Sequence, residues 1–400
     1  MDFIEKKARE LYRSNSGLSK PADQFGVGFP LLSYSDIFHN FIVPDNLITL
    51  VNSTENERAN CSIKRGDVFL TRTSETTEEL GMSCVALKDI PGATFNGFAK
   101  RLRPITDEIV PEYAAYYFRS NYFRAQCMSM ASLITRASLN DGMIGRLTIR
   151  YPKKKSDQEK IGGILLHYDD LISNNIKRVK SLEQIVENIY KEWFVRFRFP
   201  GYKGIEFENG VPKEWKKRKL REIAVEVDRP ERAENRCNYD HYLPIDKIPA
   251  KSMVLQEEDS IENAESSLIS FKKGDVLFGA MRSYLHKVII APFDGLTRST
   301  CFVINSIEPE YKLFVYLLLY QKSSVDFATT VSVGSTMPYA RWKDFSRMNI
   351  VVPNREIVKQ FNMAVEPIMR RIQYFYDMNQ KLIKQRDLLL PRLMSGKLEV

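Results

Sequence analysis

"SIKRGDVF", residues Ser62 to Phe69, returns later in the chain as "SFKKGDVL", residues Ser270 to Leu277, with five of the eight positions identical. Each copy places two basic residues before Gly-Asp and follows the aspartate with an apolar, strand-forming run. Glycine permits a tight turn and aspartate bonds its own backbone, so we predict a structural role for Gly66-Asp67 and Gly274-Asp275. Two copies in one chain indicate an internal duplication.

The duplication extends to a second pair of segments. The stretch 135–152, "TRASLNDGMIGRLTIRYP", aligns without a gap with the stretch 336–353, "TMPYARWKDFSRMNIVVP". Each ends in a β-like run that stops at proline, which cannot donate to a strand ladder. The sequence therefore predicts short strands that end at Pro152 and Pro353.

A long helical pattern follows each of these prolines. Apolar residues recur at alternating steps of three and four for about four heptads, as in the seam of a coiled coil. The two seams comprise Leu165, Tyr168, Ile172, Asn175, Val179, Leu182, Val186, Ile189 and Trp193, then Ile368, Ile372, Phe375, Asn379, Leu382, Arg386, Leu389 and Leu393. We expect 196–201 to close the first helix and 394–396 the second, and Pro367 to stand at a helix start, where proline is tolerated.

Apolar seams do not stay exposed on single helices, so we expect the two helices to pair with each other. An antiparallel pairing would place the two domains at opposite ends of a rod on the order of 40 Å long. One turn of duplex DNA spans roughly 34 Å, so the domains would lie about one turn apart. Each seam carries one asparagine, Asn175 and Asn379. A buried asparagine fixes register, and a tolerated polar residue in an imperfect seam fits equally well.

These patterns predict an α+β protein with an internal pseudo-two-fold repeat. Four hundred residues exceed one ordinary core. We expect two globular α/β domains in tandem, separated by two long helices that pair as an antiparallel coiled coil. The predicted segments are a first domain at 1–155, its helix at 156–200, a second domain at 201–355 and its helix at 356–400.

Composition narrows the function class. The formal net charge of +9 fits an anionic partner such as nucleic acid, and also an ordinary basic cytosolic protein. The five cysteines and four histidines show no ligand spacing, so we expect neither a disulfide framework nor a zinc site. There is no signal peptide and no apolar run of membrane-spanning length, so we expect a cytoplasmic protein that does not bind membranes.

Familiar catalytic motifs are missing from the sequence. It contains no phosphate-binding G-x-x-x-x-G-K-[ST] loop, no H-E-x-x-H and no G-x-S-x-G. The carboxylates do not cluster at the spacing that a metal-dependent nuclease requires. These absences favour a protein that binds over one that catalyses.

Several stretches, in this order, resemble a known family. They are "DVFLTRTSETTEELGMSCVAL" (67–87), "TFNGFAKRLRP" (94–104), "IYKEWFVRFRFPG" (189–201), "VPKEWKKRKLREIA" (211–224) and "QRDLLLPRLMSGKLEV" (385–400). Together they resemble the specificity subunit of type I restriction-modification systems over nearly the whole chain. The N-terminal stretch lacks the P-x-x-W opener seen at Pro212 to Trp215, so the first domain is expected to be permuted or trimmed.

The resemblance implies separate roles for the globular domains, the helices and the partner subunits. Each globular domain would read one half of a bipartite target in double-stranded DNA, and the helices would form the spacer. The subunit would join two DNA-methyltransferase subunits and, indirectly, restriction-translocase subunits. It would have no catalysis and no cofactor of its own, because S-adenosylmethionine, ATP and Mg²⁺ would act on those partners.

Candidate DNA-binding residues are polar or basic side chains at strand exits and in the repeated segments, because phosphate contacts give affinity and base-edge contacts give specificity. In the first domain they are Thr71, Arg72, Thr73, Ser74, Asn96, Lys100, Arg101, Arg103, Arg136, Ser138 and Asn140. In the second they are Arg282, Ser283, Tyr284, His286, Lys287, Arg298, Ser335, Thr336, Tyr339, Arg341 and Lys343. A solvated strand edge is the competing interpretation for the basic residues.

Two other function classes stay open at this stage. A duplicated coiled-coil adaptor would bind only proteins, and it would have no salt-dependent affinity for DNA. An enzyme with an unrecognised site would show activity alone, with Mg²⁺ or S-adenosylmethionine. The aromatic residues Trp193, Phe194 and Phe197 either dock partner helices or close the core where helix meets domain.

Overall fold

The computed structural model describes residues 1–74, 76, 79–130, 132–133, 137–255 and 257–400. The chain divides into two units. Unit 1 comprises residues 1–172 and 382–400, and unit 2 comprises residues 173–381. The long helices α7 (Lys155–Tyr190) and α11 (Arg355–Met394) each contribute to both units.

Unit 1 is built on a four-stranded antiparallel sheet. Its order is β2 (Tyr12–Ser16), β9 (Ala99–Pro104), β5 (Val68–Thr71) and β7 (Ser83–Val85). Two three-stranded sheets join β4 (Leu50–Val51), β3 (Phe25–Leu32) and β8 (Thr94–Phe95), and β10 (Ser132–Leu133), β11 (Ala137–Ser138) and β6 (Thr73–Ser74). The strand β1 (Phe3–Lys7) pairs antiparallel with β12 (Thr148–Pro152), which ends at proline as predicted.

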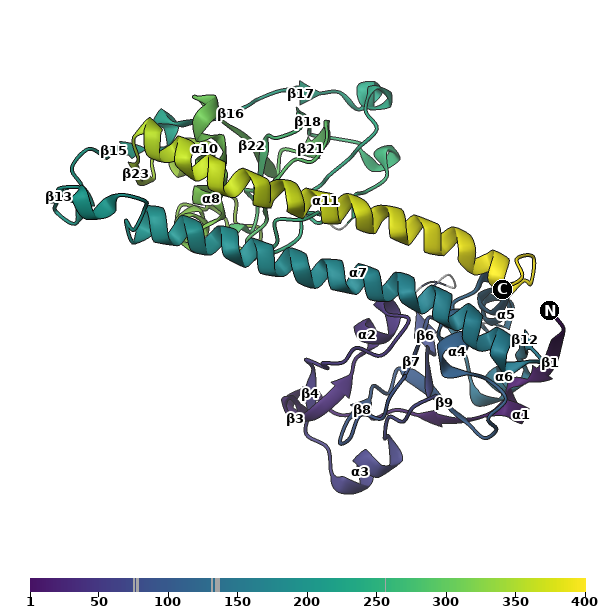
Figure 1. Ribbon diagram of the computed structural model, residues 1–400. Helices are drawn as coiled ribbons and strands as arrows, with labels where there is room; N and C mark the ends of the chain where they lie inside the picture. The colour runs from purple at the N-terminus through teal and green to yellow at the C-terminus, as the bar shows by residue number, and fades with distance from the viewer. Residues whose placement is uncertain (75, 77–78, 131, 134–136, 256) are drawn as a thin grey trace. The chain divides into compact units, whose positions relative to one another are not determined.

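Short helices accompany the sheets of unit 1 (Figure 1). They are α1 (Ala8–Leu11), α2 (Tyr34–His39), α3 (Glu55–Asn60), α4 (Pro111–Tyr117), α5 (Asn121–Met130) and α6 (Asp141–Arg146). One core cluster gathers the α4 tyrosines with Leu165 of α7 and Leu393 of α11. The beginning of α7 and the end of α11 thus pack into the same core, as an antiparallel pair does.

Unit 2 repeats this arrangement. Its four-stranded antiparallel sheet has the order β16 (Ala224–Glu226), β22 (Cys301–Ser306), β19 (Val276–Gly279) and β20 (Val288–Ile290). Further sheets join β17 (Pro230–Glu231), β18 (Leu268–Phe271) and β21 (Gly295–Arg298), then β13 (Phe207–Glu208) and β14 (Val211–Pro212), then β15 (Lys216–Lys219) and β23 (Asn349–Val352). The helices besides α7 and α11 are α8 (Lys312–Tyr320), α9 (Lys322–Thr330) and α10 (Trp342–Phe345).

The opening strands show that the first domain is not permuted. Lys7 pairs with Thr148, and Lys219 pairs with Asn349 at the equivalent place in the alignment of the two copies. The order β1, α1, β2 in unit 1 therefore matches β15, a 3₁₀ turn at Leu220–Glu222 and β16 in unit 2. Residues 1–20 open a domain in the same way as residues 213–232.

The C-terminal helix corrects one prediction. Pro367 does not begin α11, because the helix starts twelve residues earlier, at Arg355. The cap is Asn354, whose Oδ1 accepts the backbone N–H of Ile357 at 3.0 Å. Pro367 lies inside the helix, where it has no N–H to offer the carbonyl of Met363. The helix ends at Met394, next to the predicted stop.

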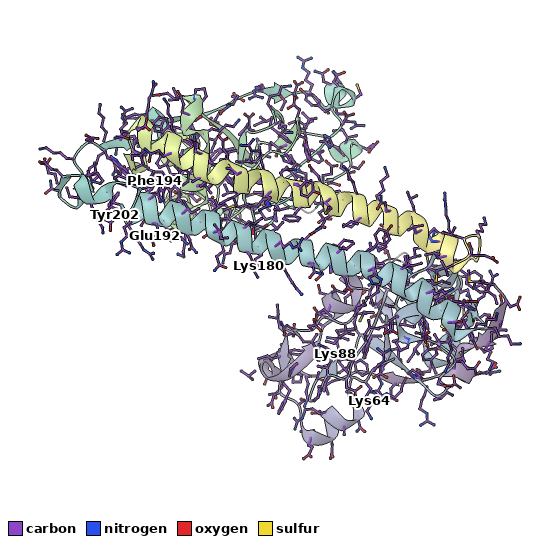
Figure 2. The ribbon with its side chains drawn as sticks, viewed as in Figure 1. Lys64, Lys88, Lys180, Glu192, Phe194 and Tyr202 are labelled. Carbon is purple, nitrogen blue, oxygen red and sulfur yellow. The ribbon has the colours of Figure 1, made fainter. Side chains whose placement is uncertain are left out.

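The aromatic residues after α7 close the core of unit 2. Phe194 is buried, and its ring lies 4.7 Å from that of Phe361 and 5.8 Å from that of Trp215. Phe197 contacts Trp215 edge to face. Figure 2 shows Phe194 at this end of α7, whereas Lys180 on the same helix is exposed. Of the two interpretations for this aromatic group, closure of the core is the one that the packing supports.

Candidate nucleic-acid interface

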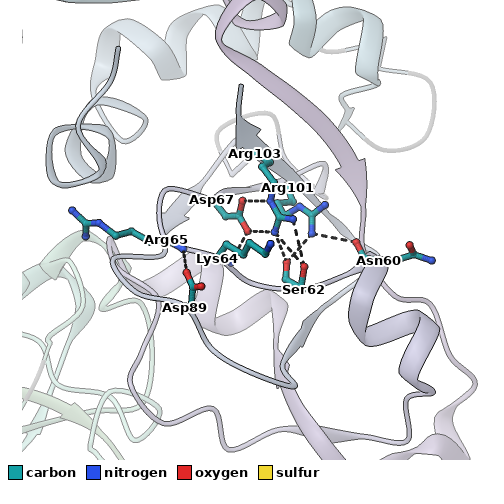
Figure 3. A network of polar contacts seen from close by, with 8 residues as sticks. All are labelled: Asn60, Ser62, Lys64, Arg65, Asp67, Asp89, Arg101 and Arg103. Atoms are coloured by element: carbon teal, nitrogen blue, oxygen red, sulfur yellow. Dashed lines mark hydrogen bonds and ion pairs between the residues drawn. The ribbon is translucent and has the colours of Figure 1, made fainter. Parts of the chain in front are cut away.

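The Gly-Asp turn of unit 1 is held by hydrogen bonds and an ion pair within the unit (Figure 3). Gly66 has a φ of +87°, and the buried carboxylate of Asp67 accepts the backbone N–H of Lys64 at 2.8 Å. Arg103 donates to both carboxylate oxygens, Nε to Oδ1 at 2.8 Å and Nη2 to Oδ2 at 2.6 Å. The predicted structural role of Gly66 and Asp67 is confirmed.

The same turn recurs in unit 2. Gly274 has a φ of +88°, and Asp275 accepts the backbone N–H of Lys272 at 2.9 Å. A second aspartate completes each turn: Asp89 accepts the N–H of Arg65, and Asp294 accepts the N–H of Lys273, both at 2.7 Å. The duplication therefore extends to individual hydrogen bonds.

The arginine that pairs with the aspartate of the Gly-Asp turn comes from different positions in the two copies. Arg103 and Asn305 occupy equivalent places on β9 and β22, one residue beyond Leu102 and Ile304 in the matching registers. Asn305 keeps one hydrogen bond, to Oδ1 of Asp275 at 3.1 Å, and Arg229 supplies the charge at 2.8 Å from Oδ2. A buried carboxylate needs such a partner, so each copy has retained one.

In each unit three segments meet at one place, which we call the junction. In unit 1 the N–H of Arg72 donates to the carbonyl of Phe98 at 3.1 Å, and the N–H of Leu139 donates to the carbonyl of Arg72 at 2.8 Å. In unit 2 the N–H of Ala280 donates to Thr300 at 2.9 Å, and the N–H of Ala340 donates to Ala280 at 3.0 Å. In both units these bonds join the exit of the central strand, the turn before β9 or β22, and the segment before α6 or α10 in the same way.

Several predicted residues of unit 1 lie at its junction. Thr73 pairs with Ser138 between β6 and β11, and Arg72 is half-buried beside them. Thr71 and Ser74 are buried and bond to Glu79, while Asn96 accepts the N–H of Phe98. Asn140 is exposed, and its Oδ1 caps α6 through the N–H of Met143. Arg136 lies outside the described residues.

The basic residues of β9 point into unit 1 instead. Lys100 is 5% exposed and donates to Ser16 and Asp141, while Arg101 is 5% exposed and donates to the carbonyls of Asn60 and Ser62. Burial lowers the pKa of the Arg101 guanidinium. With Arg103 bound to Asp67, all three side chains have partners inside the unit, and Figure 3 shows those of Arg101 and Arg103. We therefore assign them to the fold and leave them out of the surface that we propose for DNA.

The predicted residues of unit 2 divide in the same way. Ser283 is buried and donates to the carbonyl of Ala280, His286 is buried with Nε2 2.8 Å from the carbonyl oxygen of Tyr320, and Lys287 donates to the carbonyls of Ile245 and Asp246. Burial lowers the pKa of His286. Six predicted residues are exposed: Tyr284, Arg298, Ser335, Thr336, Arg341 and Lys343. Arg282 and Tyr339 are half-buried.

Sequence reasoning missed the apolar residues at these places. Phe98 at the junction of unit 1 is 57% exposed, and in unit 2 Leu285, Val333 and Met337 are exposed. Polar and basic side chains are the usual sequence signal of a DNA contact, and these apolar positions lack it. The signal in the sequence is an apolar residue beside a turn former, as in "NGF" and "SVGSTM".

Across the residues that the structure describes, no three His, Cys, Asp or Glu side chains are grouped so that they could hold a metal ion. The described helices include none with the length and apolar character needed to cross a bilayer. All five cysteines are free, and only Cys237 among them is exposed.

Comparison with known proteins places these observations in a family. The model of the type I restriction modification DNA specificity domain matches residues 3–184 and again residues 212–387. The chain belongs to this family. The two matches coincide with the two copies of the repeat, each with its own junction and its own long helix.

Relatives of this family cover most of the chain. The MjaIX type I restriction enzyme specificity subunit of Methanocaldococcus jannaschii is 27% identical over 87% of this chain and 82% of its own length. The HindI specificity subunit of Haemophilus influenzae is 22% identical over 85% of this chain and 88% of its own length. The crystal structure of a type I restriction-modification S subunit from M. genitalium matches with a TM-score of 0.58 at 11% identity, over 98% of this chain and 96% of that one, and supports the fold.

Proposed function

We propose that this chain is the DNA-recognition subunit of a type I restriction-modification complex, and that each unit reads one of two separated blocks in double-stranded DNA. The observation that carries the proposal is the duplicated junction, with the same hydrogen bonds in both units. A duplicated reader fits a target in two parts. The alternative of a protein-binding adaptor without DNA specificity has no comparable observation behind it.

The exposed groups at the junctions suit the two tasks of DNA recognition. Cations such as Arg298, Arg341 and Lys343 supply phosphate contacts, which give affinity without sequence information. Hydroxyl and aromatic groups such as Thr336 and Tyr284 contact base edges, where sequence is read. The net charge of +9 draws the subunit toward DNA over a longer range.

The long helices are the part that we propose for partner docking. Two DNA-methyltransferase subunits would bind along them, and restriction-translocase subunits would join the complex through those. Exposed apolar residues on each helix support this: Leu171 (52%) and Ile185 (46%) on α7, and Tyr374 (56%) and Leu388 (57%) on α11. S-adenosylmethionine, ATP and Mg²⁺ would serve the partners, in the cytoplasm, while this chain carries no catalytic step.

Co-expression with its methyltransferase partner, followed by methylome sequencing of the host DNA, tests the proposal. We expect a split motif, with two short defined blocks separated by a fixed run of unspecified bases. A single continuous motif would contradict the two-reader account. Failure to form a complex, together with no salt-dependent DNA affinity of the chain alone, would favour the adaptor.

A further inference from the structure

At the junction of unit 2, two loops that are bonded to each other carry exposed apolar side chains, which we call the apolar tip. Tyr284 (53% exposed) and Leu285 (41%) come from the loop after β19, and Val333 (60%) and Met337 (61%) come from the hairpin before α10. The two loops are joined by a hydrogen bond from the N–H of Arg282 to the carbonyl of Pro338 at 2.7 Å. Large exposed apolar groups that gather at one place usually mark a binding site.

The first loop holds its tip residues in a strained backbone. Arg282 and His286, which flank the 3₁₀ turn Ser283–Leu285, have φ values of +51° and +55°. This left-handed conformation is unfavourable for side chains other than glycine, so the surrounding contacts must impose it. Those contacts are the hydroxyl of Ser283 on the carbonyl of Ala280 and the buried ring of His286 against Tyr320. Tyr284 and Leu285 are therefore held outward with little freedom.

The second loop is equally well anchored. Val333 and Tyr339 exchange both backbone hydrogen bonds at 3.0 Å, and Gly334 turns the chain with a φ of +105°. Tyr339 donates its hydroxyl to the carbonyl of Ser299 at 3.1 Å, which ties the hairpin to the third segment of the junction. Preorganised loops lose little entropy on binding, as recognition surfaces require.

Exposed cations lie on the segments next to the apolar tip. Arg298, on β21 beside the junction, and Arg341 and Lys343, directly after the hairpin, are all exposed. Tyr339, through its bond to Ser299, links these two cationic segments. An apolar centre with a basic rim is complementary to a polyanion whose interior offers apolar groups. Duplex DNA has this character, with phosphates at the edges of the major groove and the 5-methyl group of thymine on its floor.

We infer that the apolar tip enters the major groove and reads thymine methyl groups in the block recognised by unit 2. The inference rests on the proposed function and adds the chemical class of the contact. The major groove, about 12 Å wide, admits elements as thick as an α-helix or a two-stranded ribbon, and the loop 333–339 is closed by a single antiparallel bridge between Val333 and Tyr339. Apolar side chains find one favourable partner among the base-edge groups there, the methyl of thymine.

Uracil substitution in the DNA tests the inference with the unaltered protein. The complex with the methyltransferase subunits is bound to duplexes in which each thymine of the second block is replaced in turn by deoxyuridine. Loss of one buried methyl should weaken binding roughly fourfold at one or more positions. A second block without thymine, or no effect at every position, would overturn the inference.

Substitutions in the tip locate the contact. Leu285→Ala and Met337→Ala should relax or abolish the second block in the methylome, leave the first block unchanged, and remove the sensitivity to uracil. Leu285→Met and Met337→Leu keep an apolar side chain and should retain the second block, which separates loss of contact from loss of folding. Val225→Ala and Ile307→Ala, equally exposed apolar positions outside both loops, serve as controls.

The outcomes separate this inference from the proposed function. If the wild-type complex methylates no split motif, the two-reader proposal itself fails, whatever the variants do. If the split motif appears and both alanine variants keep an unchanged second block, the two-reader proposal stands and the apolar tip is excluded as its contact.

Discussion

The side-chain amide of Asn175 donates to the side-chain oxygen of Asn379 at 2.9 Å, across two helices within unit 2. Asn175 is 3% exposed and Asn379 is half-buried, so the hydrogen bond is partly shielded from solvent. Each asparagine alone fits a tolerated imperfection, but the hydrogen bond between them gives the two a joint role. A paired asparagine of this kind restricts the helices to the one register in which the two amides meet.

Replacement of either asparagine tests the pairing. Asn175→Leu alone should destabilise unit 2 by about 1–3 kcal/mol, because it removes the hydrogen bond between the two side chains and places an apolar group beside the half-buried Asn379. The double replacement should recover most of that loss. Tryptophan fluorescence during denaturation reports on this unit, because Trp193, Trp215 and Trp342 all lie in it. Additive effects in the double-mutant cycle would mean that the two amides do not stabilise each other.

The guanidinium of Arg103, which pairs with Asp67, should be essential for the stability of unit 1. Arg103→Ala leaves a buried carboxylate without its cation, and we expect a loss of about 3–5 kcal/mol. Hydrogen exchange in β5 and β9 would measure it, while tryptophan fluorescence should stay unchanged. Arg65→Ala, which removes the exposed pair with Glu112, is the matched control and should cost about 1 kcal/mol or less. Equal costs for the two variants would contradict this account.

Acid should weaken unit 2 through His286. Burial lowers the pKa of this histidine below its ordinary value of 6.5, so the folded state favours the neutral ring. Its contribution to stability is therefore complete above pH 6.5 and is lost as the pH falls through the lowered value. The charged groups near it are Glu187, Lys251 and Asp326.

His286→Asn removes this titration and suits the left-handed backbone. The stability difference between wild type and variant should therefore shrink as the pH falls from 7 toward 5, as followed by tryptophan fluorescence. A difference that stays constant over this range would show that His286 does not couple folding to pH.

The interior proline of α11 offers a stabilising change. Pro367→Ala restores a backbone donor and removes the ring clash, so unit 2 should gain up to about 3 kcal/mol. Pro391→Ala, in the same helix but within unit 1, is the control and should leave the tryptophan transition in place. A loss of stability for Pro367→Ala would mean that packing has adapted to the proline.

The repeated turn and the helical seams were predictable because local sequence determines them. A Gly-Asp turn, a strand that stops at Pro152 and an apolar seam need no knowledge of distant residues. The side chains of β9 were not predictable in this way. Arg101 and Arg103 read as a basic surface, yet Ser62 and Asp67 meet them only after the sheet has formed. The apolar tip was missed because its residues come from two loops, which only the fold unites.

A chimera tests the central claim most directly, namely that each unit reads its own block of DNA. Residues 4–152 would replace residues 216–353, since β1 and β12 correspond to β15 and β23, and the host methylome would be sequenced after co-expression with the methyltransferase. The account predicts a motif in which the block read by unit 1 occurs at both ends. An unchanged motif from an assembled complex would contradict it.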